Sequence, residues 1–292
     1  MASQMTSHTA LIALTRLFRL PLALMVALTA VAAAITAGQS LSGTTLAGLG
    51  WGIFLLAAAS SVLNQVQERT TDALLRRTCR RPIACGLLPV ASGIQLGLLL
   101  ATAGTALLLL IGGLAPALLG LAALVWYLVV YTPLKRITPL AVLAGTPCGS
   151  VPVLIGWLVA GGTLPAPQPF ALALVLLLWQ VPHYWLLALP ERDELAAAGF
   201  RVLSGNISNH RLLVLSHRWI LGLALTTLLL PALELVTQPL ARGGVVALAL
   251  ALVVCSTWLL RRTLFAEIAA RYLRIGLSFY LLFVLLLLLV GG

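Results

Sequence analysis

Long apolar runs, each long enough to cross a bilayer, constrain this chain more than any other feature. A hydrocarbon core of about 30 Å needs about 20 consecutive apolar residues in one helix. With 61% hydrophobic and 9% charged residues among its 292 positions, the chain is predicted to be an integral membrane protein. We place nine such runs, at residues 18–38, 44–64, 91–112, 114–133, 139–161, 168–189, 218–237, 243–260 and 275–291.

The fold class follows from how backbone polar groups are satisfied in lipid. The runs show no alternation of apolar and polar residues, which disfavours an outer-membrane barrel and favours helices. We therefore predict an all-α polytopic membrane protein whose nine transmembrane helices form a bundle around a central cavity. Residues 1–16 are predicted to be a cytoplasmic N-terminal tail, and residues 17–292 a single transmembrane domain.

The basic residues predict the orientation, because Lys and Arg accumulate in cytoplasmic loops. With the N-terminus in the cytoplasm, only Arg242 of the 18 basic residues falls on the outer side. The net charge of +11 is therefore attributed to topology and to anionic headgroups, and it gives no reason to expect a nucleic-acid partner. Of the acidic residues, Glu234 alone is predicted to lie inside a span, while the others gather at the inner face.

Three oxygen-bearing side chains follow the second run at a spacing of four residues. On a helix, Asn64, Glu68 and Asp72 drift by only about 40° per step, so they share one face over about 12 Å. Positive-inside topology gives no reason for acidic residues at this spacing, whereas carboxylate and amide oxygens are ligands that Mg²⁺ accepts. The spacing therefore predicts a site for a divalent cation.

A cluster of arginines comes directly after these residues, and guanidinium groups match phosphate oxygens well. Arginines at the end of a span are also common topogenic flanks, so their presence alone decides nothing. Combined with the oxygen ligands, however, they predict a pocket for a diphosphate. A second acidic group follows the sixth run, which predicts two metal ions facing each other across a central cavity. The arginines are Arg76, Arg77, Arg80 and Arg81, and the second acidic group is Glu191, Asp193 and Glu194.

The segment from residue 64 to residue 86 resembles the first acidic motif of the UbiA-type intramembrane prenyltransferases. Its tail is most similar to that of the protoheme IX farnesyltransferase branch, the haem O synthases, and the resemblance extends over residues 60–205. The residues that carry this first motif are Asn64, Glu68, Asp72, Arg76, Arg77, Thr78, Arg81, Pro82 and Gly86. Further similar segments, in the same order, contain Tyr131-Thr132 with Lys135-Arg136, then Gly145 to Trp157, then Trp179 to Leu189, and then Asp193-Glu194 with Gly199.

The resemblance implies a Mg²⁺-dependent transfer of a farnesyl group from farnesyl diphosphate to a vinyl group of haem b, which gives haem O. It places the site at the cytoplasmic face of a cell inner membrane, and haem A synthase or oxidase-assembly factors are conceivable partners besides the lipid bilayer. The implied catalytic residues are Asp72, Asp193 and Lys135, and the implied metal ligands are Asn64, Glu68, Asp72, Asp193 and Glu194. Diphosphate would be bound by Arg76, Arg77, Arg81, Lys135 and Arg136, and the pocket for acceptor and isoprenoid would contain Tyr131, His183 and Trp185.

Two alternatives stay open at this stage. One is a prenyltransferase of the same fold that acts on another aromatic acceptor, such as a quinone precursor. The other is a transporter or a non-catalytic paralogue, because a fold does not guarantee an activity. Departures from the branch motif bear on both, since the branch has other residues at Glu68, Ala141, Glu194 and Leu195.

Overall fold

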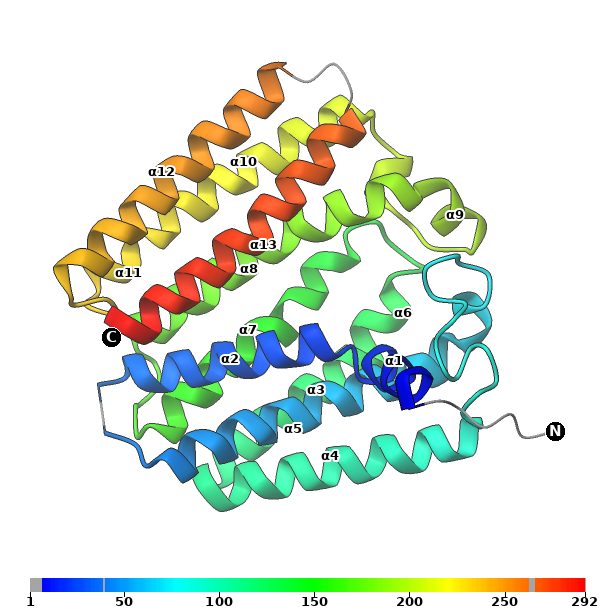
Figure 1. Cartoon of the computed structure of the whole chain (residues 1–292), viewed down its shortest axis with the longest axis horizontal. Helices are drawn as coiled ribbons and strands as arrows, with labels where there is room; N and C mark the ends of the chain where they lie inside the picture. The colour runs from blue at the N-terminus through cyan, green and yellow to red at the C-terminus, as the bar shows by residue number, and fades with distance from the viewer. Residues whose placement is uncertain (1–6, 39, 263–265, 292) are drawn as a thin grey trace.

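The computed structural model describes residues 7–38, 40–262 and 266–291, and this part of the chain is built from helices without a strand (Figure 1). The N-terminal half contains α1 (Ser7–Phe18), α2 (Leu20–Thr36), α3 (Gly43–Asp72), α4 (Val90–Gly112), α5 (Leu114–Val125), the π-helix η1 (Trp126–Tyr131) and α6 (Thr132–Leu134). The remainder contains α7 (Ala141–Val159), α8 (Pro167–Ala188), η2 (Leu189–Glu191), α9 (Arg192–Ala197), η3 (Leu203–Gly205), α10 (Asn209–Thr227), α11 (Leu229–Ala232), α12 (Pro239–Arg262) and α13 (Ala266–Gly291).

The helices match the predicted membrane spans. Within the described residues, eight helical stretches are long and apolar enough to cross a membrane, and the bent pair α1 and α2 makes a ninth if it counts as one span. Each predicted run overlaps one of these stretches. The prediction of an all-helical, multi-pass membrane protein is confirmed, while the count of nine and the side of the N-terminus stay predictions.

Several helices continue beyond the apolar runs that predicted them. The run 44–64 belongs to α3, which ends at Asp72, and the run 275–291 belongs to α13, which begins at Ala266. Backbone hydrogen bonding does not stop where polar side chains begin, so hydropathy finds the apolar part of a helix and misses its polar ends. The predicted N-terminal tail is likewise helical from Ser7 onward.

Glu234 lies elsewhere than predicted. It belongs to the connection between α11 and α12, where its side chain is exposed and its backbone is left-handed with φ 61°. The predicted span 218–237 overlooked this turn, which comes between Pro231 and Pro239. The helical stretch ends at Ala232, so Glu234 lies beyond it and gives no support to the transporter alternative, which would need charges within the spans.

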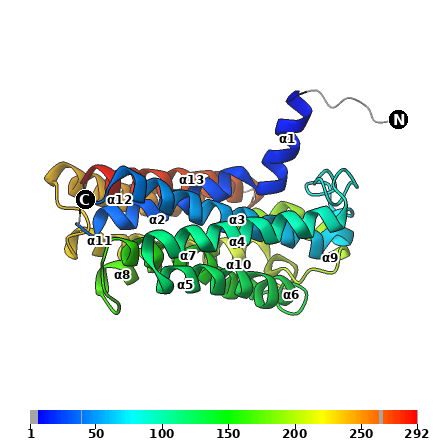
Figure 2. The same ribbon diagram turned by 90° about the horizontal axis from the view of Figure 1, so that it is seen from below.

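Arg19 separates α1 from α2 and sets the angle between them. Its backbone is left-handed, with φ 49° and ψ 51°, a conformation that costs a residue with a Cβ about 1–2 kcal/mol. The two helices meet at 53°, and Figure 2 shows α1 turned away from the bundle. Strained backbone of this kind is often found at functional sites, and here it directs the Arg19 side chain to the interior.

Two apolar cores lie side by side and share their central helices. The larger core joins α8, α10, α12 and α13, the smaller one joins α3, α4 and α5, and α2 and α7 contribute to both. The two central helices approach closely at Gly156, where a Cβ would collide with the backbone oxygen of Ala30. The polar connections gather at one end of this bundle, where Figure 1 shows α6, α9 and the loop 73–89, while α11 and the C-terminus lie at the other end.

Candidate active site

Two cavities with a common wall occupy the interior of the bundle. The larger one has a volume of about 640 Å³, lies between the two cores, and is lined mainly by apolar side chains of α2, α3, α5, α7, α8 and α13. The smaller one has a volume of about 190 Å³ and lies at the end that carries the polar connections. The residues that line both cavities, and so form the junction between them, are Arg19, Tyr131, Lys135, Val142 and Tyr184.

The smaller cavity is lined by more positive than negative side chains. This excess favours an anion with several charges, because the attraction is strong where water is largely excluded. A diphosphate fits this description, and guanidinium groups suit its oxygens. The lining contains the cationic side chains of Arg19, Arg77, Arg81, Lys135 and Arg201 and the carboxylates of Glu68, Asp72 and Glu191.

Buried ion pairs hold the carboxylates of α3 in place. Nη1 of Arg81 lies 2.7 and 2.6 Å from the two carboxylate oxygens of Asp72, and Nζ of Lys135 lies 2.7 Å from Oε1 of Glu68. Burial lowers the pKa of Arg81 and of Lys135, and in each case the adjacent carboxylate opposes this shift. Both pairs border the cavity. An entering anion could therefore bind the cationic side chains, and an entering cation could bind the carboxylates, in place of their present partners.

The second acidic segment brings one carboxylate to the cavity. Glu191 lines it and accepts a hydrogen bond of 3.0 Å from Nε of Arg77. Glu194 instead accepts a hydrogen bond from the backbone N–H of Arg76, away from the cavity lining. The side chain of Asp193 is 94% exposed and lies 3.5 Å from Arg192, so the structure does not bring it together with Asp72.

Other predicted site residues lie beside the cavity without lining it. Nδ2 of Asn64 donates a hydrogen bond of 3.1 Å to Oγ1 of Thr132, one turn of α3 deeper than Glu68. Nη2 of Arg136 donates a hydrogen bond of 3.3 Å to Oγ1 of Thr71. These contacts fix α3 against the end of the helical stretch Leu114–Leu134, so the structure gives both residues a supporting position.

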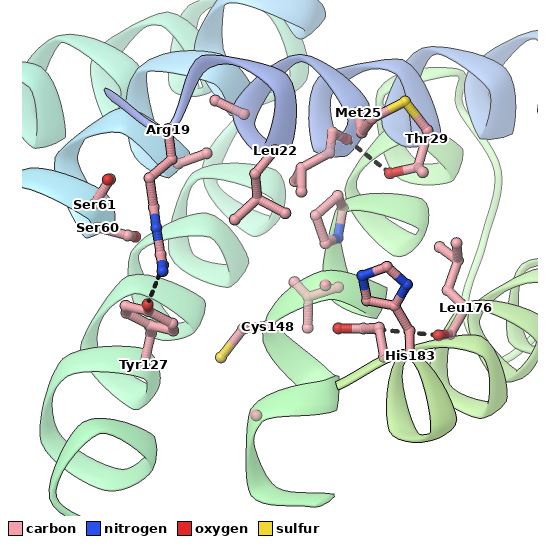
Figure 3. Close-up of a pocket in the computed structure, with 18 of the residues that line it drawn as sticks. Arg19, Leu22, Met25, Thr29, Ser60, Ser61, Tyr127, Cys148, Leu176 and His183 are labelled. Carbon is pink, nitrogen blue, oxygen red and sulfur yellow. Dashed lines mark hydrogen bonds between the residues drawn. The ribbon is translucent and has the colours of Figure 1, made fainter. Parts of the chain in front are cut away.

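The junction is built around a π-helical turn. Such turns interrupt α-helices and are frequent at functional sites. Tyr131 ends η1, and Nζ of Lys135 lies 5.1 Å from the centre of its ring. A Cβ at Gly145 would lie 2.6 Å from this ring, so the glycine makes room for it. Figure 3 shows Arg19 reaching toward Tyr127, whose hydroxyl accepts a hydrogen bond of 3.3 Å from Nη1 of the arginine.

The predicted acceptor residues divide between the two cavities. His183 points into the larger one (Figure 3), where its ring stacks on Trp179 at 4.6 Å and 25°. Its Nδ1 is buried and has no hydrogen-bond partner among the described residues. Trp185 lines the smaller cavity and packs edge-on against Trp219 at 5.7 Å. Tyr131 belongs to both cavities.

Three charged residues of the smaller cavity are absent from the predicted site set, namely Arg19, Glu191 and Arg201. For Arg19 the sequence does offer a signal, because Pro21 shortly after it indicates a helix start and therefore a break in the run. Glu191 enters the prediction only as part of the second acidic group, and Arg201 has no place in it. For these two the sequence offers no signal, because a connection of short helices does not define which way a side chain points.

The oxygen donors of the smaller cavity suit a hard divalent cation. Glu68 and Asp72 share one buried face of α3, and Glu191 approaches from η2. Each of these carboxylates is turned toward a cationic side chain, and within the described residues no group of three ligands converges as a metal site would require. The donor chemistry fits Mg²⁺, and the ligands would have to leave their present partners to bind it.

Comparison with known proteins identifies the family of the chain. The model of the UbiA prenyltransferase family matches residues 23–279. A protein from Oleidesulfovibrio alaskensis named protoheme IX farnesyltransferase is 38% identical over 233 residues, which cover 80% of this chain and 82% of the relative. A protein of the same name from Geobacter sulfurreducens is 41% identical over 226 residues, with coverages of 77% and 83%.

Solved structures share the fold at low sequence identity. A structure of digeranylgeranylglyceryl phosphate synthase superposes with a TM-score of 0.76 at 14% identity and covers 96% of this chain and 98% of that one. A UbiA homolog from Archaeoglobus fulgidus, bound to DMAPP and Mg²⁺, superposes with a TM-score of 0.67 at 15% identity, with coverages of 95% and 99%. The chain belongs to the UbiA prenyltransferase family and is a membrane-embedded prenyltransferase.

Proposed function

We propose that this prenyltransferase transfers a farnesyl group from farnesyl diphosphate to a vinyl group of haem b and depends on Mg²⁺. The observation that carries the proposal is the shared wall of the two cavities. A charged cavity suited to a diphosphate adjoins an apolar cavity suited to an isoprenoid and a flat acceptor, and Tyr131 and Lys135 line both.

The names of the relatives support the acceptor and the donor. The two relatives described above are protoheme IX farnesyltransferases, and each covers more than three quarters of this chain. The structures of the Archaeoglobus fulgidus homolog with DMAPP or GPP and Mg²⁺ support a prenyl diphosphate and a divalent cation as its ligands. We extend both properties to this chain as part of the proposal.

The residues of the smaller cavity would bind and activate the leaving group. When the bond between the allylic carbon and the diphosphate oxygen breaks, negative charge grows on the diphosphate. Lys135, Arg77 and Arg81 line the cavity and would stabilise this charge, and fixed cations in a site with little water do so strongly. Arg19, at the junction, would hold the end of the diphosphate nearest to the isoprenoid.

We propose that Mg²⁺ is held by Glu68 and Asp72 from α3, with Asn64 in support, and by Glu191 from η2. When bound, the ion would neutralise charge on the departing diphosphate. Lys135 and Arg81, which now pair with Glu68 and Asp72, would then turn to the diphosphate oxygens. Asp193 and Glu194, the ligands that the family resemblance implies, reach this position only if the connection after α8 rearranges.

The larger cavity would position the acceptor and keep water from the allylic cation. The π electrons of the vinyl group form a carbon–carbon bond to the farnesyl carbon that has lost diphosphate. The positive charge then lies on the vinyl carbon next to the porphyrin, where one water molecule adds and releases a proton. Tyr131 at the junction would stabilise the cation through its ring. The product is haem O, and diphosphate is released.

We place this site at the cytoplasmic face of an inner membrane. The basic residues support this side, because the arginine-rich loop 73–89 and α9 lie at the same end of the bundle as the charged cavity (Figure 1). Farnesyl diphosphate would then arrive from the cytoplasm, and haem b through the lipid or from the cytoplasm. Haem A synthase, which would consume haem O, and oxidase-assembly factors are the protein partners that the proposal suggests.

The proposal is tested with purified protein in lipid nanodiscs and labelled farnesyl diphosphate. Haem b and 4-hydroxybenzoate are offered as acceptors, each with Mg²⁺ or with EDTA. We expect labelled haem O, no labelled benzoate, and no product with EDTA. Labelled benzoate together with unchanged haem would refute the acceptor and point to the quinone-precursor alternative. No product with any acceptor, although Mg²⁺ is present, would point to the non-catalytic alternative.

A further inference from the structure

Arg274 on α13 is a cationic residue of the larger cavity that does not border the smaller one. Two arginines of the charged end are paired with carboxylates, Arg81 with Asp72 and Arg77 with Glu191. Among the residues that the structure describes, the Arg274 guanidinium has neither an ion pair nor a hydrogen bond. An arginine in an apolar cavity within a membrane protein is costly, so its position calls for an anionic partner that is not part of the chain.

The packing of α8 against α13 defines the level of Arg274 in the bundle. The two helices run in opposite directions (Figure 1), and Nε1 of Trp179 donates a hydrogen bond of 2.7 Å to the backbone oxygen of Leu277. One turn onward along α8 and one turn back along α13, His183 therefore lies level with Arg274. The next residue, Tyr184, borders both cavities, so Arg274 stands at the depth of the junction, on the α13 wall.

Topology alone does not explain this arrangement. Positive-inside flanking would account equally for Arg271 and Arg274, which lie three residues apart on α13. Arg271 is exposed and does not line either cavity, as a flank would be. Arg274 lines the larger cavity beside the stacked rings of Trp179 and His183. A flat aromatic surface next to an unpaired guanidinium suits a planar aromatic acid.

We infer that Arg274 recognises a carboxylate of the acceptor and thereby determines which edge of the acceptor faces the diphosphate. This inference rests on the proposed function, because haem b is planar and carries its two propionates on the edge opposite to its vinyl groups. With a propionate at Arg274, a vinyl group would point across the cavity toward Tyr131 and Lys135. Arg274 would be a specificity-determining residue that acts on the acceptor and leaves the binding of farnesyl diphosphate unchanged.

The test compares haem b with its dimethyl ester, in which both propionates are esterified. Binding is followed by the shift of the Soret band on titration into protein in nanodiscs of zwitterionic lipid, so that anionic headgroups do not compete for Arg274. We expect the wild type to bind haem b about ten- to 100-fold more tightly than the ester, as a charge-assisted hydrogen bond predicts. Arg274→Met should remove this preference, Arg274→Lys should keep part of it, and the control Arg271→Met should keep all of it.

Steady-state turnover gives a second measurement, because a loss of folding would not raise the KM for one substrate alone. In Arg274→Met we expect a higher KM for haem b and an unchanged KM for farnesyl diphosphate. Equal binding of haem b and its ester by the wild type, or the same preference in Arg274→Met, would overturn the inference even if haem O is formed. If haem b is not an acceptor at all, the proposed function fails, and the inference is then decided with 4-hydroxybenzoate and its methyl ester in the same variants.

Discussion

The two acidic segments of this protein differ in how firmly their carboxylates are held. Glu68 and Asp72 belong to α3, a helix of 30 residues, and both are buried against cationic partners. Asp193 and Glu194 belong to α9, which has six residues and follows a single 3₁₀ turn. In the long helix, a spacing of four residues fixes the direction of each side chain. In the short helix the two carboxylates are adjacent in sequence and so point to different sides, and Glu191, which precedes α9, is the carboxylate that reaches the cavity.

The largest effect is expected at the firm segment, from Asp72→Asn. The variant removes a carboxylate that the proposed metal site needs and leaves Arg81 without its charged partner. We expect kcat/KM to fall by about 100- to 1000-fold, as when a group that stabilises transition-state charge is lost. Because breaking a buried ion pair costs about 3–5 kcal/mol, the melting temperature should fall as well. The measurement is farnesyl transfer together with thermal unfolding in nanodiscs.

Stability and catalysis are separated by the double variant Asp72→Asn with Arg81→Gln. It removes both charges of the pair, so the stability should recover in large part while the activity stays low. Glu267→Gln, an exposed carboxylate on α13, is the matched control and should keep both. Recovery of activity in the double variant would mean that Asp72 serves only to neutralise Arg81.

The second prediction concerns the carboxylate that the second segment brings to the cavity. Glu191→Gln keeps the size of the side chain but removes the charge that orients Arg77 at 3.0 Å. We expect kcat/KM to fall by about ten- to 100-fold, in the range for groups that hold a metal or its ligands in place. The activity should also require more Mg²⁺, which a titration of the metal ion would measure. An unchanged Mg²⁺ requirement would exclude Glu191 as a ligand.

A smaller effect is expected from the link between the two segments, the pair of Arg77 and Glu191. If the two residues act together, the losses in kcat/KM of Arg77→Gln and Glu191→Gln should not add. The kcat/KM of the double variant should then be only slightly below that of the less active single variant. A double-mutant cycle on kcat/KM measures this coupling. Fully additive losses would show that the two residues contribute independently, in contrast to the geometry of the pair.

The same difference between a long helix and a short connection explains how much of the structure the sequence predicts. The long apolar runs predict the spans, because lipid requires helices and a helix needs a minimum length to cross it. The spacing of Asn64, Glu68 and Asp72 predicts a shared face of α3, and the structure places all three on its buried side. Arg77, Arg81 and Lys135 were predicted near a diphosphate, and they line the charged cavity.

The remainder depends on connections and breaks, for which local sequence carries little information. The left-handed backbone of Arg19 brings its side chain to the lining of both cavities, and a π-helical turn brings Tyr131 to the junction. The direction of Asp193 and Glu191 depends on how η2 and α9 meet the loop 73–89, which lies far away in sequence. Tertiary contacts decide these directions, and a single sequence does not display them.

The smallest effect is expected at Asp193, where the family resemblance and the structure disagree. Asp193→Asn alters a residue that the family resemblance places among the catalytic groups, yet its side chain is 94% exposed and, among the described residues, forms an ion pair with the neighbouring Arg192 alone. Exposed ion pairs contribute about 0–1 kcal/mol, so we expect kcat/KM within about twofold of the wild type and an unchanged Mg²⁺ titration. A comparison of this variant with Glu191→Gln shows which of the two carboxylates the reaction needs. A loss at Asp193 that exceeds the loss at Glu191 would show that η2 and α9 rearrange when substrate binds, so that the weakly held segment exchanges one carboxylate for another.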